Sequence, residues 1–119
     1  MARSHSTARL AAYQRSYREL AQRVANIGFI AAGTITHRHT RCGKPGCRCG
    51  ADPPQPHGPY YQWTAKINGR TVTRRLTETE ATRYQEWITN DRKLRALIAE
   101  MRQLAAQATE LIMQDANDR

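Results

Sequence analysis

Hydrophobic side chains between residues 7 and 27 recur at spacings of three and four, which predicts an amphipathic helix. The recurring positions are Leu10, Tyr13, Tyr17, Leu20, Val24 and Ile27. They match the a and d positions of a heptad repeat, and Gly28 can cap the end of the helix. Residues 1–6 lack this pattern, so we expect a flexible basic arm there.

The pattern changes to one typical of β-strands between residues 29 and 76. Residues 33–40 are rich in β-branched side chains, residues 60–67 alternate between apolar and polar positions, and residues 70–76 are the predicted return strand. Asn68-Gly69 separates the last two segments and is a strong indication of a tight hairpin turn. The sequence therefore predicts a three-stranded antiparallel sheet.

A second helix is predicted from residue 78 to about 114. Thr77 and Glu80 have the spacing of a capping box at its start, and neither Gly nor Pro occurs after Leu76. The second set of helical hydrophobic positions is Leu94, Leu97, Met101, Leu104, Ala108 and Leu111. This helix would be roughly 55 Å long and the first roughly 30 Å. The apolar stripe that remains uncovered predicts a coiled-coil-like bundle in a homodimer.

The fold class expected from these elements is α+β. The chain has 119 residues, which fits a single domain over 1–119. Its order is the helix 7–27, the sheet region 29–76 and the long helix 78–114. A loop at 42–57 lies between the first and second strands.

The charge is strongly positive and unevenly distributed. Lys and Arg total 19 against 10 Asp and Glu, a net charge of +9. Residues 1–49 hold nine of the basic residues and only one acid, Glu19. Such asymmetry favours a polyanionic partner, although arginine richness can also reflect a GC-rich genome. No apolar run approaches the ~20 residues that span a bilayer and no signal peptide is visible, so we expect a cytoplasmic protein, nucleoid-associated if it binds DNA.

All three cysteines lie within eight residues, in Cys42-Gly43-Lys44-Pro45-Gly46-Cys47-Arg48-Cys49, and His57 follows. Three thiols and an imidazole on a loop rich in Gly and Pro suit a tetrahedral Zn²⁺ ion. We therefore predict a structural zinc site formed by Cys42, Cys47, Cys49 and His57. Its four protein ligands would leave no position for a reactive water.

Other interpretations of the cysteine loop stay open at this point. A disulfide with one remaining thiol, a redox sensor and a catalytic Cys–His pair are the alternatives. The fourth zinc ligand could also be His37 or His39, which precede Cys42. No carboxylate pair with a neighbouring base and no phosphate-binding glycine loop is evident, so we do not expect an enzyme.

The motif resembles a family of small uncharacterised bacterial proteins. The shared core comprises CGKPGCRC at 42–49, HGPYY at 57–61, Trp63 and the segment 69–76. The resemblance extends over about residues 28–100. It implies a domain of unknown function whose members accompany mobile elements.

The predicted hairpin supplies a second candidate site. A hairpin followed by the Thr-Glu-x-Glu-Ala helix start resembles the small sheet-plus-helix DNA-binding domains of phage-type integrases, in which one sheet face enters the major groove. Arg and Thr side chains could contact phosphates and base edges there, or could simply cover a solvated sheet. Trp63 and Tyr61 fit a core better than a base-stacking surface. The candidate nucleic-acid contacts are Arg38, Arg41, Lys44, Arg48, Lys66, Arg70, Arg74 and Arg75.

The function expected from the sequence is a zinc-stabilised DNA-binding protein that serves a mobile element or recombination system. The alternative is a zinc-containing adaptor that docks a recombinase or transposase without touching DNA.

Overall fold

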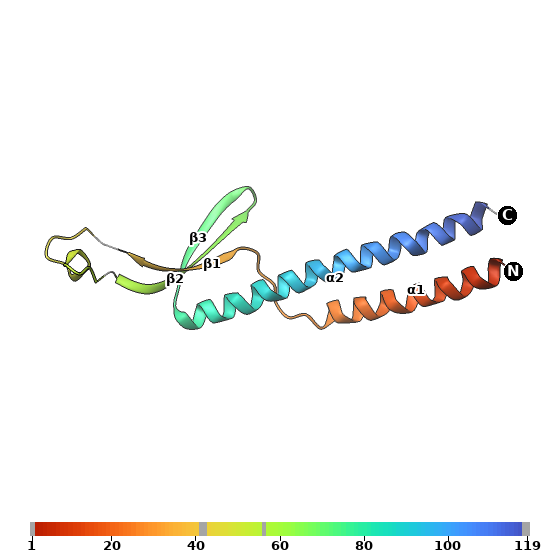
Figure 1. Ribbon diagram of the computed structural model, residues 1–119, viewed down its shortest axis with the longest axis horizontal. Helices are drawn as coiled ribbons and strands as arrows, with labels where there is room; N and C mark the ends of the chain where they lie inside the picture. The colour runs from red at the N-terminus through yellow and green to blue at the C-terminus, as the bar shows by residue number, and fades with distance from the viewer. Residues whose placement is uncertain (1, 41–42, 56, 118–119) are drawn as a thin grey trace. The chain divides into compact units, whose positions relative to one another are not determined.

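A computed structural model of the chain describes residues 2–40, 43–55 and 57–117, and leaves the side chains of 2–5, 40, 57 and 58 undescribed. Its elements are α1 (Ala2–Ala25), β1 (Thr34–Thr40), the short 3-10 turn η1 (Arg48–Gly50), β2 (His57–Ile67), β3 (Arg70–Leu76) and α2 (Glu78–Asn117). Figure 1 shows them in chain order. The predicted α+β class is confirmed, with its N-terminal helix, three-stranded antiparallel sheet and long C-terminal helix.

Two elements extend further towards the N-terminus than the sequence pattern suggested. Helix α1 begins at Ala2 and not at Thr7, so residues 2–6 are helical where we predicted a flexible arm. Nothing in this segment breaks a helix, because it contains neither Gly nor Pro. Strand β2 begins at His57, three residues before the predicted Tyr60, because it pairs with Thr40 of β1 across an irregularity in the register.

The chain divides into two compact units, which we describe separately. The sheet unit comprises residues 29–89, and the helical unit comprises residues 1–28 with 90–119. Helix α2 contributes to both. The single-domain organisation stays a prediction.

In the sheet unit the strand order is β1-β2-β3, with both pairs antiparallel. Trp63 at the centre of β2 lies opposite Ile35 on one side and Arg74 on the other. The hairpin turn falls at Asn68-Gly69, as predicted, and both residues have positive φ angles, 52° and 78°. A type I′ turn requires such angles, and its twist matches that of the flanking strands.

The core of the sheet unit lies between one face of the sheet and the first turns of α2. Trp63, Ala65 and Leu76 pack there against Ala81 and Ile88 of the helix. The Trp63 ring lies 5.0 Å from that of Tyr84, and its indole N–H donates a 2.9 Å hydrogen bond to the Ala32 carbonyl.

Gly33 permits this close approach of the chain to Trp63. Its φ angle is +108°, and a Cβ atom built on it would lie 2.5 Å from the Thr64 carbonyl oxygen and 2.7 Å from the Trp63 indole nitrogen. Only glycine combines that backbone conformation with that spacing.

Helix α2 starts with the predicted capping box. The Glu80 N–H donates to the Thr77 hydroxyl at 3.2 Å, and the Thr77 N–H donates to the Glu80 carboxylate at 3.0 Å. These two bonds satisfy donors that a helix start otherwise leaves without partners.

In the helical unit, α1 runs antiparallel to the C-terminal part of α2 (Figure 1). Leu97 and Leu111 are its buried side chains among the described residues, each 7% exposed. The remaining hydrophobic positions predicted for the two helices are half-buried or exposed. Neither described helix has a stretch long and apolar enough to cross a membrane.

Candidate nucleic-acid interface

The sheet has a second face, which points away from the core. Because side chains alternate along a strand, the pairing register assigns to it the residues between the core positions. We call this surface the open face. Its members are Thr34, Thr36, Arg38, Tyr60, Gln62, Thr64, Lys66, Thr71, Thr73 and Arg75.

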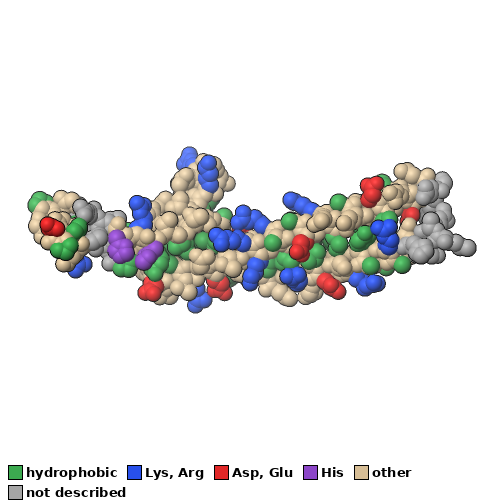
Figure 2. Space-filling view, viewed as in Figure 1, with side chains coloured by type: hydrophobic (Ala, Val, Ile, Leu, Met, Phe, Trp, Pro, Cys, Tyr) green, Lys and Arg blue, Asp and Glu red, His purple; other side chains and the backbone are tan. Residues whose placement is uncertain are grey.

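The open face is polar and carries charges of one sign only. Arg38, Lys66 and Arg75 are its ionic groups, and all three are exposed. The three strands contain no Asp or Glu. In Figure 2, Lys and Arg side chains lie at the end of the β2–β3 hairpin, and no acidic side chain is visible on that hairpin. An anion that approaches the open face therefore meets no carboxylate on it.

Contacts across the strands hold several of these side chains in place. The Arg38 guanidinium donates to the Gln62 side-chain oxygen at 3.2 Å, and the Thr36 hydroxyl donates to the Gln62 carbonyl at 3.4 Å. The guanidinium carbon of Arg75 lies 3.8 Å from the centre of the Tyr60 ring. A shallow cleft of about 300 Å³ is lined by Arg38, Tyr60, Gln62, Thr73 and Arg75. Such contacts reduce the side-chain freedom that would be lost on binding a ligand.

The structure brings together only part of the predicted set of basic residues. Arg38, Lys66 and Arg75 share the open face, whereas the register places Arg70 and Arg74 on the opposite face. There the Arg74 guanidinium lies 3.9 Å from the Glu80 carboxylate. Lys44 and Arg48 are exposed in the cysteine loop, and Arg41 lies outside the described residues.

Sequence reasoning did not select Tyr60, Gln62 or the threonines of β1 as parts of this site. The alternation of side chains along a strand could have shown that Gln62 and Trp63 lie on opposite faces of the sheet. The contact between Gln62 and Arg38, however, depends on how β1 and β2 pair. The interpretation of Trp63 and Tyr61 as core residues is confirmed, since Trp63 is 8% exposed and Tyr61 packs against the core.

The cysteine loop is organised by tight turns. The Cys47 N–H donates to the Lys44 carbonyl at 3.2 Å, with Pro45 and Gly46 between them and a φ angle of +76° at Gly46. Pro followed by a left-handed Gly is the pattern of a type II turn. The Gln55 N–H then donates to the Arg48 carbonyl at 3.0 Å, which joins the two sides of the loop.

The loop buries cysteine and little else. Cys49 is 1% exposed and Cys47 is half-buried, while every other described residue between 43 and 55 is exposed. No group of three or more His, Cys, Asp or Glu side chains able to hold a metal is found within the described part of the chain. Cys42 and the His57 side chain lie outside that part, so the four-ligand set stays a prediction.

His37 and His39, the competing ligands, lie on β1. The His37 ring stacks on Tyr61 at 4.8 Å and lies 5.5 Å from the His39 ring. The choice between them and His57 as fourth ligand stays open.

The chain belongs to the family described as Domain of unknown function (DUF6788), which matches residues 10–86. This confirms the predicted membership of a family of unknown function, whereas the shared cysteine motif and the association with mobile elements stay predictions. The match covers most of α1, the whole sheet and the first turns of α2. It therefore begins before the predicted range of 28–100, which contained no part of α1, and it ends earlier in α2. Searches among curated proteins and among solved structures found no match.

Proposed function

Starting from a family whose description assigns no activity, we propose that the protein binds double-stranded DNA and inserts the open face into the major groove. The observation that carries this proposal is a polar, acid-free sheet face with three exposed basic side chains. The hydrophobic core supports this face from the other side. The proposed role is recognition and not catalysis.

The dimensions of the sheet suit the groove of DNA. Three strands about 4.8 Å apart give a face roughly 10 Å wide, and the major groove of B-DNA is about 12 Å wide. The major groove of A-form RNA is too narrow for side chains to reach the bases. The same face therefore favours DNA over double-stranded RNA.

The side chains of the open face offer the groups that major-groove recognition uses. Arginine pairs with the two acceptors of guanine and glutamine with the edge of adenine, while threonine methyls contact the thymine methyl. Arg38, Gln62 and Arg75 would supply the first two kinds of contact. Lys66, near the hairpin turn, would contact a phosphate.

A structural zinc ion completes the proposal. Loops of this length need a core or a cross-link, and among the described side chains of this one only Cys49 is buried and only Cys47 is half-buried. Thiolates held in tight turns suit Zn²⁺, and Lys44 and Arg48 would offset the negative charge of the thiolates. When bound, the ion would fix the bend between β1 and β2.

The family resemblance extends the proposal to a role for the protein as an accessory factor of mobile-element or recombination systems, acting in the cytoplasm at the nucleoid.

Fluorescence anisotropy with duplex DNA over a range of salt concentrations tests DNA binding. The logarithm of the affinity should fall linearly with the logarithm of salt, by about 0.9 per phosphate contact. A triple variant with Arg38→Ala, Lys66→Ala and Arg75→Ala should reduce that slope by up to about 2.7. A matched variant with Arg70→Ala, Arg74→Ala and Arg83→Ala removes the same charge from other surfaces and should keep most of the slope.

If the slope of affinity against salt fell equally in the two triple variants, DNA binding would depend on the net charge and not on the open face. A wild-type affinity that does not respond to salt would reject DNA binding altogether and favour the adaptor alternative.

Metal analysis of the purified chain tests the zinc site separately. We expect about one Zn²⁺ per chain, with loss of the metal in Cys47→Ser and in Cys49→Ser. A chain that contains no metal and keeps its tryptophan fluorescence in the presence of a chelator would reject the zinc proposal.

A further inference from the structure

The cleft on the open face holds two arginines in place through different contacts. The Arg38 guanidinium donates to the Gln62 side-chain oxygen at 3.2 Å, and the guanidinium carbon of Arg75 lies 3.8 Å from the centre of the Tyr60 ring. Both arginines are exposed, whereas Gln62 and Tyr60 are half-buried. Two half-buried side chains of β2 therefore support two exposed guanidinium groups within one cleft.

Hydrogen-bond donors outnumber acceptors in this cleft. A guanidinium has five N–H donors and no acceptor. Within the described part of the chain, Arg38 donates from its side chain only to Gln62, and the Arg75 side chain makes no hydrogen bond or ion pair. The Gln62 oxygen is the one amide or carboxylate acceptor among the lining side chains, and it already accepts from Arg38. The hydroxyls of Tyr60 and Thr73 can both donate and accept, so an incoming ligand meets mainly donors.

Guanine is the base whose major-groove edge best matches such a set of donors. It presents two acceptors, N7 and O6, which one arginine can bind together. Cytosine presents only its N4 amino donor, adenine has its N6 amino donor beside N7, and thymine has one acceptor next to a methyl group. A donor that faces an amino group in a closed interface is left without a partner, which is costly. The cleft can therefore distinguish base pairs by whether their edges accept or donate hydrogen bonds.

We propose that this cleft makes the protein prefer G·C pairs over A·T pairs, and that Arg38 and Arg75 are the residues that determine this specificity. The inference rests on the proposed insertion of the open face into the major groove. Each arginine pairs with one guanine. Gln62 has its oxygen on Arg38 and keeps its NH2 group for the bases, where it donates to N7 of either purine.

Competition anisotropy at one salt concentration, with four duplexes of equal length, tests the preference. One duplex contains only G·C pairs, the second has inosine in place of guanine, the third has 7-deazaguanine, and the fourth contains only A·T pairs. Inosine keeps N7 and O6 but lacks the amino group of guanine in the minor groove, whereas 7-deazaguanine lacks N7. The G·C and inosine duplexes should bind alike, at least about 25-fold more tightly than the A·T duplex. The 7-deazaguanine duplex should bind more weakly than the G·C duplex, because each arginine loses one of its two acceptors.

Substitutions that preserve charge separate base recognition from phosphate contact. Arg38→Lys and Arg75→Lys keep the positive charge but replace the planar fork of donors with a single ammonium group. Each should lower the ratio of G·C to A·T affinity at least about fivefold and keep the salt dependence of the wild type. Arg74→Lys is the matched control, because Arg74 is adjacent in sequence to Arg75 but lies beside Glu80 on the other face. It should keep the wild-type ratio.

The outcomes distinguish a failure of this inference from a failure of DNA binding. Equal affinity for the G·C and A·T duplexes, with the salt dependence intact, would overturn the inference and leave DNA binding in place. The inference also fails if inosine removes the preference, since the minor groove would then carry it, or if both lysine variants keep the wild-type ratio. Absence of binding to all four duplexes would instead reject the proposed function, and the inference with it.

Discussion

The sheet unit and the helical unit solve the problem of burial in different ways. The sheet unit has a core of its own, in which Trp63, Leu76 and Ile88 are buried, although Phe29, Ile30, Ile67 and Val72 are exposed. The helical unit keeps Tyr17 and Ile112 more than a third exposed beside a groove. Both units have many hydrophobic positions in sequence, so hydrophobicity alone does not distinguish them.

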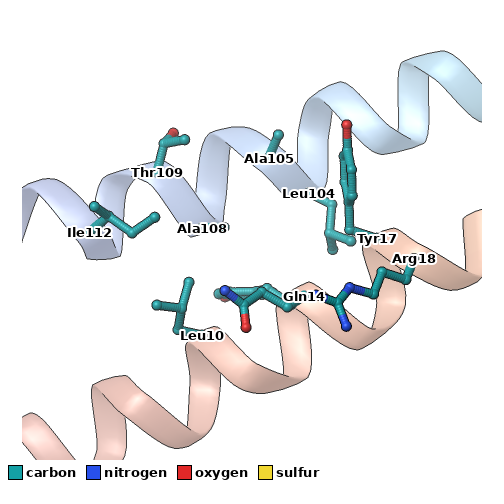
Figure 3. A pocket seen from close by; sticks show the side chains of 10 residues that line it. Leu10, Gln14, Tyr17, Arg18, Leu104, Ala105, Ala108, Thr109 and Ile112 are labelled. Carbon is teal, nitrogen blue, oxygen red and sulfur yellow. The ribbon is translucent and has the colours of Figure 1, made fainter. Parts of the chain in front are cut away.

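The difference shows where each unit can carry function. Because the core of the sheet unit lies on one face of the sheet, the composition of the other face is free to serve recognition. In the helical unit, an apolar groove lies open between α1 and the C-terminal part of α2 (Figure 3). Substitutions in each unit test this contrast.

Replacing Trp63 with Ala should have the largest effect. The substitution empties the centre of the sheet core and removes the hydrogen bond to Ala32, so we expect the free energy of unfolding to fall by about 3–5 kcal/mol. Tyr17→Ala, at the groove, should cost only about 1 kcal/mol in the monomer, because the ring is partly exposed there.

Urea unfolding distinguishes the two substitutions. Both tryptophans, Trp63 and Trp87, lie in the sheet unit, so fluorescence reports on that unit, and far-UV circular dichroism follows the helices. Equal losses from the two substitutions would contradict the contrast between the units.

Gly33→Ala should be the next most damaging change. The new methyl group would clash with the Thr64 carbonyl and the Trp63 ring, and we expect a loss of about 3 kcal/mol or more. Gly69→Ala is the matched control, since Gly69 also has a positive φ angle but a Cβ atom added to it would meet nothing within 4 Å. Its cost should be about 1–2 kcal/mol from backbone strain alone, measured by the same urea unfolding.

Local signals in the sequence predicted most elements of the fold. The capping residues Thr77 and Glu80 marked the start of α2, and Asn68-Gly69 marked the hairpin, because each signal depends on backbone geometry within a few residues. The start of β2 was missed, since it depends on pairing between His57 and Thr40 across the cysteine loop. Long-range pairing leaves no local pattern.

The candidate interface was only partly predictable for the same reason. Basic residues could be selected by type, but their division between two faces requires the register. Arg74 and Arg75 are adjacent in sequence, yet one lies beside Glu80 and the other over the Tyr60 ring. The contact between Arg38 and Gln62 joins residues 24 positions apart and had no counterpart in the sequence pattern.

Thr77→Ala should have a smaller effect, about 1 kcal/mol, because it removes the hydroxyl that accepts the Glu80 N–H at the start of α2. The capping residue lies in the sheet unit, so the loss should appear in the tryptophan signal. Thr82→Ala provides a control, because its hydroxyl bonds to the Glu78 carbonyl inside the helix and caps nothing. A cost at Thr82 as large as that at Thr77 would show that the cap contributes no stability of its own.

The smallest expected effect is a pH dependence of the same helix start. Hydrogen bonds from Thr77, with a further contribution from the nearby Arg74 charge, hold the pKa of Glu80 below its ordinary value of 4.5. The ionised carboxylate is therefore favoured in the folded state, and its stabilisation is complete above the unfolded pKa. It is lost as the pH falls below 4.5 through the lower folded pKa. Glu80→Gln keeps an oxygen acceptor for the Thr77 N–H but does not titrate, so the acid-side decline in stability should be shallower than in the wild type. Urea unfolding at a series of pH values from about 3 to about 7 measures this difference, and identical acid profiles for the two chains would show that the Glu80 charge adds nothing to the cap.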